Sequence, residues 1–291
     1  MVRGDCMIAQ VYAKSVPGAT HLRKGTVCQD SCYWSKKAED AVIMAIADGH
    51  GSEKCAYSDE GAYRAVHVFC DIMQEVLNDF DGDIDSLKPL IDENRILAKK
   101  ISTLWHKRIT RKHNDEHREK LDTESSREIK KRTSIRNALD KANQTKVDYM
   151  LYGTTLLGVA VLGDSALVYQ IGDGDIQIVT EDGVSSLVEA DKFLGVETYS
   201  LAHDMSWNYA KTTIVSLKDV KKPFLIMMST DGLSNSYIND VEFGKCCQDY
   251  FDIIKEEGFE TVKKELKDWL RDTSDHGCGD DITVALAYFE A

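Results

Sequence analysis

Four sites in this sequence place aspartate beside an apolar stretch, where catalytic chemistry could be built. Two of those stretches, residues 41–47 and 223–229, are nearly all apolar and are typical of buried strands. An aspartate at the end of a buried strand is costly to desolvate unless it is paired or binds a cation. The sites are Asp30, Asp48-Gly49-His50-Gly51, Asp231-Gly232-Leu233-Ser234 and Asp280-Asp281. These aspartates are therefore the candidates for a functional site.

Carboxylate oxygens with few histidines nearby favour Mg²⁺ or Mn²⁺ over zinc. Glycine at position 49 would leave its carbonyl open to a second ion, because no side chain crowds it. Such a ligand set suits a two-metal site that activates water against phosphorus, with ions roughly 3.5–4 Å apart. The spacing leaves a second interpretation open, in which the aspartates only form turns and cap helices, because a sequence pattern cannot show that they converge.

The elements that would have to position these residues are mostly strands. Short apolar runs separated by Gly-Asp and Asp-Gly turns predict antiparallel hairpins. We expect strands over residues 6–13, 41–47, 154–162, 165–171, 175–180, 184–187, 223–229 and 282–289. The segment Gly172-Asp173-Gly174-Asp175 lacks the lysine and the following helix of a phosphate-binding P-loop, so we expect a hairpin turn there.

Helical spacing of apolar residues predicts a helix from an N-cap at Ser52 to about Phe80, and two more over about 240–256 and 259–271. Residues 85–146 also keep helical spacing and become strongly charged, with a local excess of Lys and Arg, which predicts two helices joined by a solvated turn near 113–125. We interpret the clusters Arg108–Lys112 and Lys130–Arg136 as a solvated helix face with i,i+4 ion pairs, and binding of an acidic partner is the alternative.

Composition excludes several classes of protein. The 291 residues include 49 Asp and Glu against 36 Lys and Arg, a formal charge of −13, which argues against nucleic-acid binding. No apolar run approaches the roughly 20 residues that cross a bilayer, so we expect no membrane association. The eight cysteines have neither zinc-site spacing nor a secretory signal before them, which predicts reduced thiols and a cytoplasmic location. Without a linker or a repeat, residues 1–291 are expected to form one domain that carries the charged helical segment at about 85–146.

Six motifs in a fixed order resemble the metal-dependent protein phosphatases, the type-2C serine/threonine phosphatases, and especially their compact bacterial members. The resemblance runs from about residue 15 to residue 289. Each motif is weak alone, and their common order makes the resemblance specific. The motifs are Gln29-Asp30, Asp48-Gly49-His50-Gly51, Gly153-Thr154-Thr155, Gly172-Asp173, Ser229-Thr230-Asp231-Gly232-Leu233 and Asp280-Asp281-Ile282-Thr283-Val284.

The resemblance implies an α+β fold, a four-layer α-β-β-α sandwich of two antiparallel sheets between helices, with two Mg²⁺ or Mn²⁺ ions at one end. Carried over to this sequence, Asp48 bridges the ions and is catalytic together with His50, the candidate general acid. The Gly49 carbonyl binds one ion, and Asp231 and Asp280 complete the other. Asp30 holds water beside the ions, and Asp281, where many relatives have Asn, supports the same site.

Two departures from the family pattern bear on the site. The arginine that grips the substrate phosphate in many members is replaced by Gly25, so His21, Arg23 and Lys24 are the candidate phosphate-binding residues. The acids that bind a third ion in some relatives are replaced by Met150 and Asn235, so a third ion is not expected.

The function implied by the resemblance is hydrolysis of phosphoserine and phosphothreonine in proteins by water that two metal ions activate for in-line attack. Phosphorylated proteins are then the partners, together with a kinase acting on the same substrates. Two alternatives stay open. One is a catalytically weak or inactive module that keeps the fold and binds phosphoproteins, and the other is a phosphatase for a different phosphate ester.

Overall fold

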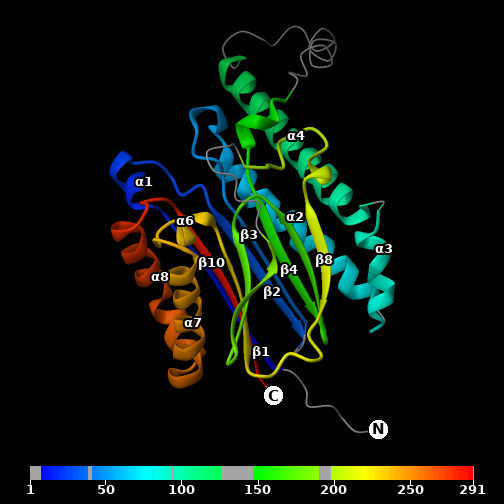
Figure 1. Cartoon of the computed structure of the whole chain (residues 1–291). Helices are drawn as coiled ribbons and strands as arrows, with labels where there is room; N and C mark the ends of the chain where they lie inside the picture. Colours follow the sequence, from blue (N-terminus) through cyan, green and yellow to red (C-terminus); the bar gives the residue numbers. More distant parts are fainter. Residues whose placement is uncertain are drawn as a thin grey trace.

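Two five-stranded antiparallel sheets pack face to face between two layers of helices in the computed structural model (Figure 1). The structure describes residues 8–38, 41–80, 82–93, 95–125, 147–189 and 198–290, and only the backbone over 116–125. Sheet A has the order β1 (Ile8–Val16), β10 (Ile282–Glu290), β9 (Phe224–Ser229), β6 (Asp175–Thr180) and β7 (Gly183–Val188). Sheet B has the order β2 (Ser31–Ala38), β3 (Ala41–Ala47), β4 (Leu156–Leu162), β5 (Ser165–Ile171) and β8 (Lys211–Ser216). The expected four-layer α-β-β-α sandwich is confirmed.

Successive side chains of a strand point to opposite faces of its sheet. In the inner strands both faces are covered, one by helices and one by the other sheet, and both sets of side chains are apolar. In β3, Ile43, Ala45 and Ala47 pack against the helices, whereas the alternating residues face the opposite sheet. All seven residues of this strand are buried. A strand covered on both sides has no solvated face to make polar, and this is why the run 41–47 is recognisable in the sequence.

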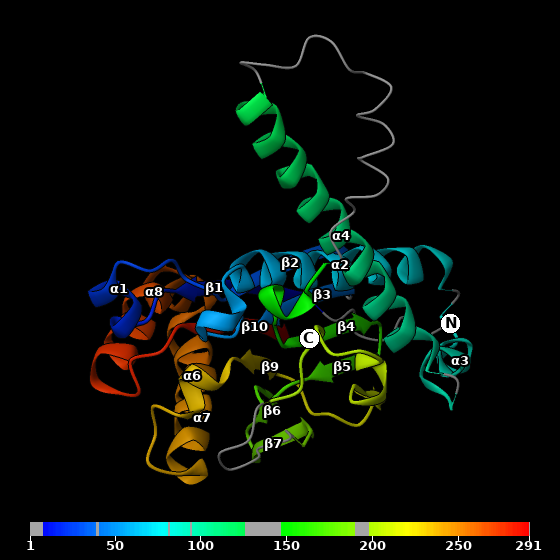
Figure 2. The ribbon, with the colours of Figure 1, turned by 90° about the horizontal axis from the view of Figure 1, so that it is seen from above.

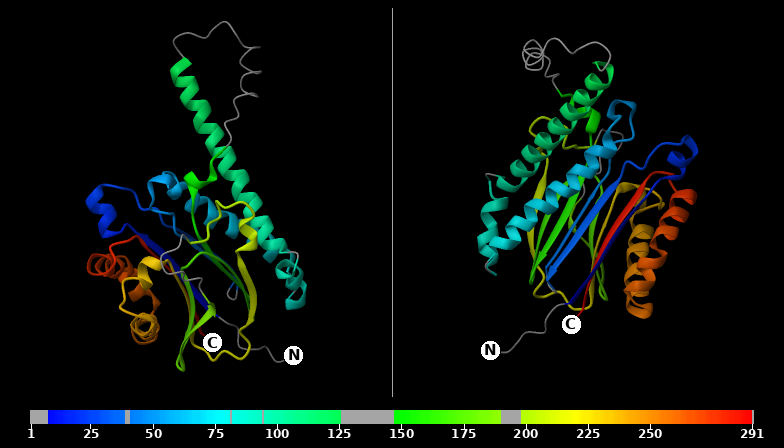
Figure 3. Two further views of the ribbon diagram at one scale, coloured as in Figure 1. Left: turned by 45° about the horizontal axis from the view of Figure 1, so that its top comes forward. Right: turned by 180° about the vertical axis from the view of Figure 1, so that it is seen from behind.

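Helices cover the two outer faces, as the views from above and from behind show (Figures 2 and 3). Sheet B is covered by α2 (Ser58–Asp79) and α4 (Ile96–Ser125), and sheet A by α7 (Asp240–Glu257) and α8 (Phe259–His276). Shorter elements connect them: α1 (Ala19–Lys24), α3 (Lys88–Ile91), α6 (Asp231–Ser234) and the 3-10 turns η1 (Glu53–Cys55), η2 (Ile84–Leu87), η3 (Tyr149–Tyr152) and η4 (Ser206–Asn208). None of the described helices is long and apolar enough to cross a membrane.

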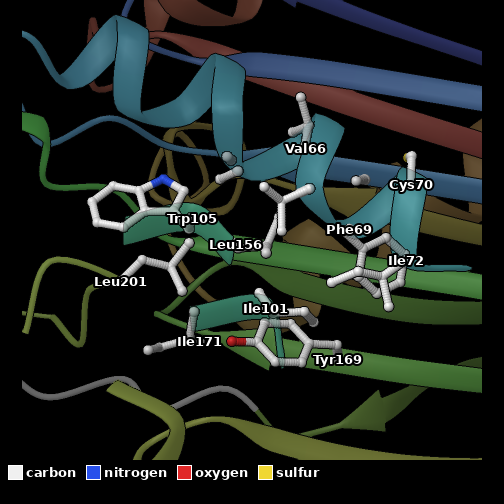
Figure 4. Close-up of a cluster of buried hydrophobic side chains, with 14 of the residues drawn as sticks. Val66, Phe69, Cys70, Ile72, Ile101, Trp105, Leu156, Tyr169, Ile171 and Leu201 are labelled. Carbon is white, nitrogen blue, oxygen red and sulfur yellow. The ribbon is translucent and has the colours of Figure 1, made fainter. Parts of the chain in front are cut away.

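The layer between sheet B and its helices is a dense apolar cluster (Figure 4). Phe69 of α2 and Trp105 of α4 are fully buried in it, and they lie near Tyr169 of β5. The indole N–H of Trp105 donates a 3.0 Å hydrogen bond to the carbonyl of Gly61, which ties α4 to α2. The two helices are therefore held together by packing and by one buried polar contact.

The charged stretch of α4 makes ion pairs mainly with α2. Arg108 contacts Asp71, and Lys112 contacts Glu60, at 2.6 and 3.2 Å. Only one i,i+4 pair of the expected kind is found in the described part of this cluster, between Arg111 and Asp115 at 3.9 Å. The basic charge at 108–112 therefore balances acids of the neighbouring helix. Lys130–Arg136 and the second predicted helix of this segment lie outside the described residues.

Three expectations about the elements are wrong. The turn predicted near 113–125 is helical, because α4 continues through it to Ser125, in a stretch with no Gly or Pro to break the helix. The helix expected from Ser52 begins at Ser58, because η1 comes first and the Tyr57 N–H donates to the Leu151 carbonyl. The last helix, α8, reaches His276 rather than ending near 271.

Strands β2 and β8 are not anticipated by the sequence pattern. Both lie at an edge of sheet B, where side chains are partly or fully exposed. A strand with one open edge needs no continuous apolar run, so its sequence resembles that of a loop. The remaining predicted strands are present with boundaries shifted by at most a few residues. The described cysteines are free thiols.

Close packing of α2 on η3 generates a stability prediction. A Cβ at Gly61 would lie 1.9 Å from the Tyr152 carbonyl oxygen, so Gly61→Ala must push the two elements apart. We expect a loss of about 1–3 kcal/mol in the free energy of unfolding, as is usual for overpacking. Urea unfolding of the purified variant measures it.

The matched control is Gly244→Ala in α7, a second helical glycine with nothing within 4 Å of a new Cβ. This change should leave stability unchanged or raise it by about 0.5–1 kcal/mol, since alanine is the better helix former. Equal effects of the two substitutions would contradict the packing shown for Gly61.

Candidate functional site

The backbone of Asp48 is fixed by the start of β4. The N–H of Thr155 donates to the Asp48 carbonyl at 2.8 Å, and the Thr154 hydroxyl donates to the same oxygen at 2.8 Å. The Asp48 N–H donates to the Thr155 hydroxyl at 3.0 Å. A single antiparallel bridge joins Gly49 to Thr154 just beyond the ladder of β3 and β4. The two threonines therefore hold Asp48 where β3 ends.

Gly49 lies in a space that admits no side chain. A Cβ there would be 2.5 Å from the Gln29 carbonyl oxygen and 2.7 Å from the Ser58 carbonyl oxygen. The residue is buried between the segment that precedes β2 and the start of α2. The glycine is thus required by close approach of backbone, in addition to any role of its carbonyl as a ligand.

Asp231 opens α6 just after β9, and it lines the same cavity as Asp48. Its Oδ2 accepts a 2.9 Å hydrogen bond from the side-chain amide of Asn235. Asn235 is one of the two positions at which some relatives carry a third-ion acid. Here it offers an N–H donor that orients Asp231.

Asp281 is buried and accepts hydrogen bonds from three parts of the N-terminal segment. Its Oδ1 accepts from the Gly18 N–H at 2.6 Å and lies 2.7 Å from Nδ1 of His21, and its Oδ2 accepts from the Gln29 N–H at 2.6 Å. This carboxylate therefore fixes the chain before β2 against the start of β10. Asp280, one residue earlier, is exposed and its side chain accepts from the Asp281 N–H at 2.8 Å.

A cavity of about 270 Å³ collects the predicted ligands. Asp48, Asp231 and Asp280 line it, together with His50 from the loop after β3. Other lining residues come from the loop between β3 and η1, from η1 itself, from η3, from just before β4, from the β5–β6 connection and from the segment before η4. They are Gly51, Ser52, Lys54, Cys55, Met150, Thr155, Asp173, Thr198, Ser200 and His203. The fold thus brings together carboxylates that are far apart in the sequence.

Burial and mutual repulsion raise the pKa values of the carboxyl groups in this region. The pKa of the Asp48 carboxyl lies well above its usual value, first because burial removes water and then because Asp30 and Asp231 repel its charge. The pKa of Asp173 is raised to about 6 by burial and by Asp231. The protein on its own therefore holds these carboxylates with too little positive charge around them.

Asp30 lies behind the cavity wall and is buried. Its Oδ2 accepts a 2.9 Å hydrogen bond from the Thr230 hydroxyl, in the residue before Asp231. Burial and then the charge of Asp281 raise the pKa of Asp30, and hydrogen bonds from Thr283 and Thr230 oppose the rise. Asp30 is therefore near the other acids without lining the cavity.

The imidazole of His50 lies over Gly153. A Cβ on Gly153 would be 2.6 Å from Cδ2 of the His50 ring, and the His50 N–H donates to the Gly153 carbonyl at 3.0 Å. The Gly-Thr-Thr motif therefore positions both predicted catalytic residues, Asp48 through its threonines and His50 through its glycine.

The candidate phosphate-binding residues of the sequence are not among the residues that line the cavity. The Nδ1 atom of His21 is engaged by Asp281. Arg23 and Lys24 are exposed on α1, and the Arg23 guanidinium donates to the Thr20 hydroxyl at 3.4 Å. The structure brings the predicted ligands and His50 together, and it places Arg23 and Lys24 outside that group.

Asp173 is the lining residue that the sequence pattern assigned to another role. The segment 172–174 is not a hairpin turn, because it carries the chain from β5 in sheet B to β6 in sheet A. Gln170 holds this crossing by donating from Nε2 to the Gly174 carbonyl at 2.8 Å. The presence of Gly172-Asp173 among the six ordered motifs was the signal that it lies at the site.

The donor set fits a hard divalent cation. The described residues contain no group of three or more His, Cys, Asp or Glu side chains that could hold an ion by themselves. Mg²⁺ characteristically needs fewer protein ligands, since it keeps several waters and binds one or two carboxylates plus substrate phosphate. Asp48, Asp231, Asp280 and the Gly49 carbonyl would supply such a set, and the raised pKa of Asp48 shows that added positive charge would relieve an existing repulsion.

Comparison with known proteins shows the family of the chain. The family model described as "Protein phosphatase 2C" matches residues 17–271. No curated protein matches the sequence. Among solved structures, the S. agalactiae serine/threonine phosphatase is 17% identical, with a TM-score of 0.60 over 96% of this chain and 99% of the other.

Two further structures share the fold. The catalytic domain of the serine threonine protein phosphatase PstP, in complex with two manganese ions, is 14% identical with a TM-score of 0.55, over 98% of this chain and 100% of the other. PppA of Pseudomonas aeruginosa is 13% identical with a TM-score of 0.56, over 97% and 98%. These likenesses are in fold, and the family model covers most of the chain. The chain therefore belongs to the protein phosphatase 2C family, whose members are phosphoprotein phosphatases.

Proposed function

We propose that this chain is a metal-dependent protein serine/threonine phosphatase whose ions are held by Asp48, Asp231, Asp280 and the Gly49 carbonyl. The observation that carries the proposal is the meeting of three predicted ligand carboxylates and His50 in one cavity of a protein phosphatase 2C chain. Family membership supports a metal requirement, and the manganese complex of PstP supports Mn²⁺ as one suitable ion, with Mg²⁺ as the other. Phosphorylated proteins are the proposed substrates.

Bound divalent ions would polarise the phosphoryl group and make a water molecule a better nucleophile. The residues of the chain perform the remaining tasks. Asp30, held by Thr230 behind the cavity wall, would accept a hydrogen bond from a water molecule between it and the ions. Asp281 keeps the segment around Gln29 in place. His50 donates a proton to the departing serine or threonine oxygen, because imidazole is the side chain that exchanges protons near neutral pH.

The direct test is release of phosphate from a phosphoserine peptide with and without Mn²⁺. We expect turnover that depends on the metal ion. It should fall by at least about 100-fold in Asp231→Asn, because the uncharged amide cannot replace the carboxylate as an anionic ligand. No turnover above the variant at saturating Mn²⁺ would contradict the proposal. Tight phosphopeptide binding without turnover would indicate the inactive module, and turnover of small esters alone would indicate a different substrate class.

The role of His50 generates a prediction about leaving groups. His50→Asn should lower kcat for a phosphoserine peptide by about 10²–10⁴-fold, the usual contribution of a general acid. Gly153→Ala should act in the same direction, because its new Cβ displaces the His50 ring. Both variants should affect 4-nitrophenyl phosphate much less, since nitrophenolate leaves without a proton. A uniform loss on both substrates would argue against a proton transfer by His50.

The raised pKa values generate a prediction about stability without metal. An acid whose pKa is higher in the folded state favours folding at low pH, and stability falls as the pH rises through the folded pKa. For Asp173 this window runs from its ordinary 3.8 to about 6, and Asp30 and Asp48 act in the same direction. Chelated protein should therefore lose stability from this cluster between about pH 4 and pH 7.

Binding of Mn²⁺ should remove this loss. At about 100 times its Kd the ion stabilises by about 2.7 kcal/mol, or about 5 °C in Tm, and the shift should be larger at pH 7.5 than at pH 5.5. Thermal unfolding with chelator and with Mn²⁺ measures both values. Asp231→Asn is the control, in which the chelated protein is more stable at pH 7.5 and the response to Mn²⁺ is weak. An equal Mn²⁺ shift at both pH values in the wild type would be inconsistent with the carboxylates as ligands.

A further inference from the structure

The cavity carries basic groups in addition to its carboxylates. Among its described lining residues, Lys54 is the one lysine or arginine, and His50 and His203 are the histidines. Lys54 belongs to η1 and His203 lies just before η4, so both come from segments that the family motifs do not include. His50 already has a proposed role. Lys54 and His203 therefore call for an explanation of their own.

The position expected for a phosphate-gripping arginine cannot supply that function here. Gly25 ends α1 in the left-handed conformation, with φ of 69°, and no atom lies within 4 Å of where its Cβ would be. Arg23 and Lys24 on the same helix are exposed and do not line the cavity. A cation of the chain would add charge-assisted contacts to the phosphoryl group beside those of the ions, and here it would have to come from another element.

The backbone around Lys54 is well fixed. The Cys55 N–H donates to the Ser52 carbonyl at 2.9 Å, and Cys55 is buried with its Sγ 3.4 Å from the Ser52 hydroxyl. Beyond it, the Tyr57 N–H donates to the Leu151 carbonyl at 2.8 Å. Lys54 itself is exposed and makes no ion pair with any residue that the structure describes. A lysine on an anchored turn, with its ammonium group uncommitted, can reach an anion at the mouth of the cavity.

The ring of His203 is oriented by its own segment. The Ser200 N–H donates to its Nδ1 at 3.3 Å, so in the neutral ring the proton is on Nε2. The segment is fixed to Thr154, which lies just before β4. The Thr154 N–H donates to the Ser200 hydroxyl at 3.0 Å, and the Leu201 N–H donates to the Thr154 carbonyl at 3.0 Å. The Nε2–H of His203 is thus available to an acceptor in the cavity.

We propose that Lys54 is the phosphate-binding cation of this enzyme, contacting the phosphoryl oxygens of the substrate in place of the family arginine, with His203 donating to the same anion. The inference rests on the proposed phosphatase function and assigns it a substrate-binding residue from η1. Charge-assisted contacts between an ammonium group and phosphate oxygens are stronger than neutral hydrogen bonds. Lys54 therefore contributes more than His203 to holding the phosphoryl group.

The test compares Lys54→Met, Lys54→Arg and His203→Asn with the wild type on a phosphoserine peptide at saturating Mn²⁺. We expect kcat/KM to fall about 10–100-fold in Lys54→Met and about 3–10-fold in His203→Asn, the effects of losing a charged and a neutral hydrogen bond. Lys54→Arg should retain most of the activity. Lys267→Met, at an exposed lysine on α8, is the matched control and should behave as the wild type.

A second measurement separates this inference from the proposed function. Inorganic phosphate should raise the Tm of the Mn²⁺-loaded wild type, and Lys54→Met should weaken that response while its Tm shift with Mn²⁺ alone stays unchanged. Full phosphate affinity in Lys54→Met, or a loss that follows Arg23→Met or Lys24→Met instead, would overturn the assignment. A wild type without turnover would refute the phosphatase function, and the phosphate response of the variants would still decide the role of Lys54.

Discussion

The repulsion among buried and half-buried carboxylates is the constraint on which this structure depends. Asp30, Asp48 and Asp173 all have a raised pKa, first because burial removes water and then because neighbouring acids disfavour their charged forms. The fold supports this arrangement with backbone hydrogen bonds at Asp48 and with apolar layers on both faces of each sheet. The packed sandwich thus holds these carboxylates close together despite their repulsion, and this arrangement favours binding of a cation.

Asp281 shows how a carboxylate can serve the same site without being a ligand. It accepts hydrogen bonds from Gly18 and Gln29 and engages His21, so one side chain joins the segment before β2 to the start of β10. Its oxygens accept hydrogen bonds from these donors, whereas burial and the charges of Asp30 and Asp231 raise the pKa of Asp48. Acids from two different motifs therefore meet at one end of the molecule with different surroundings, Asp281 among hydrogen-bond donors and Asp48 beside other acids.

The sequence predicts those parts of the fold that are buried on both sides. Strand β3 and the core strands β4 and β5 can be predicted from the sequence, because a strand covered on both faces is apolar throughout. Edge strands β2 and β8 are not, since their exposed sides remove the pattern. At the site, Asp48, Asp231 and Asp280 follow from the motifs. Asp173 could have been found from its place among the ordered motifs, whereas Lys54 and His203 depend on loop contacts that no local spacing encodes.

Strand β10 lies inside sheet A, between β1 and β9, and Ile8 of β1 pairs with Glu290 near its end. Among the described strands, β1 is synthesised before all the others and must wait for β10, the last of them, before their ladder can form. Asp280 emerges just ahead of that strand, so the set of proposed ion ligands also becomes complete only then. Such distant pairing slows folding and leaves apolar strands exposed for longer. A nascent chain stays incapable of dephosphorylating anything until the whole sandwich can close.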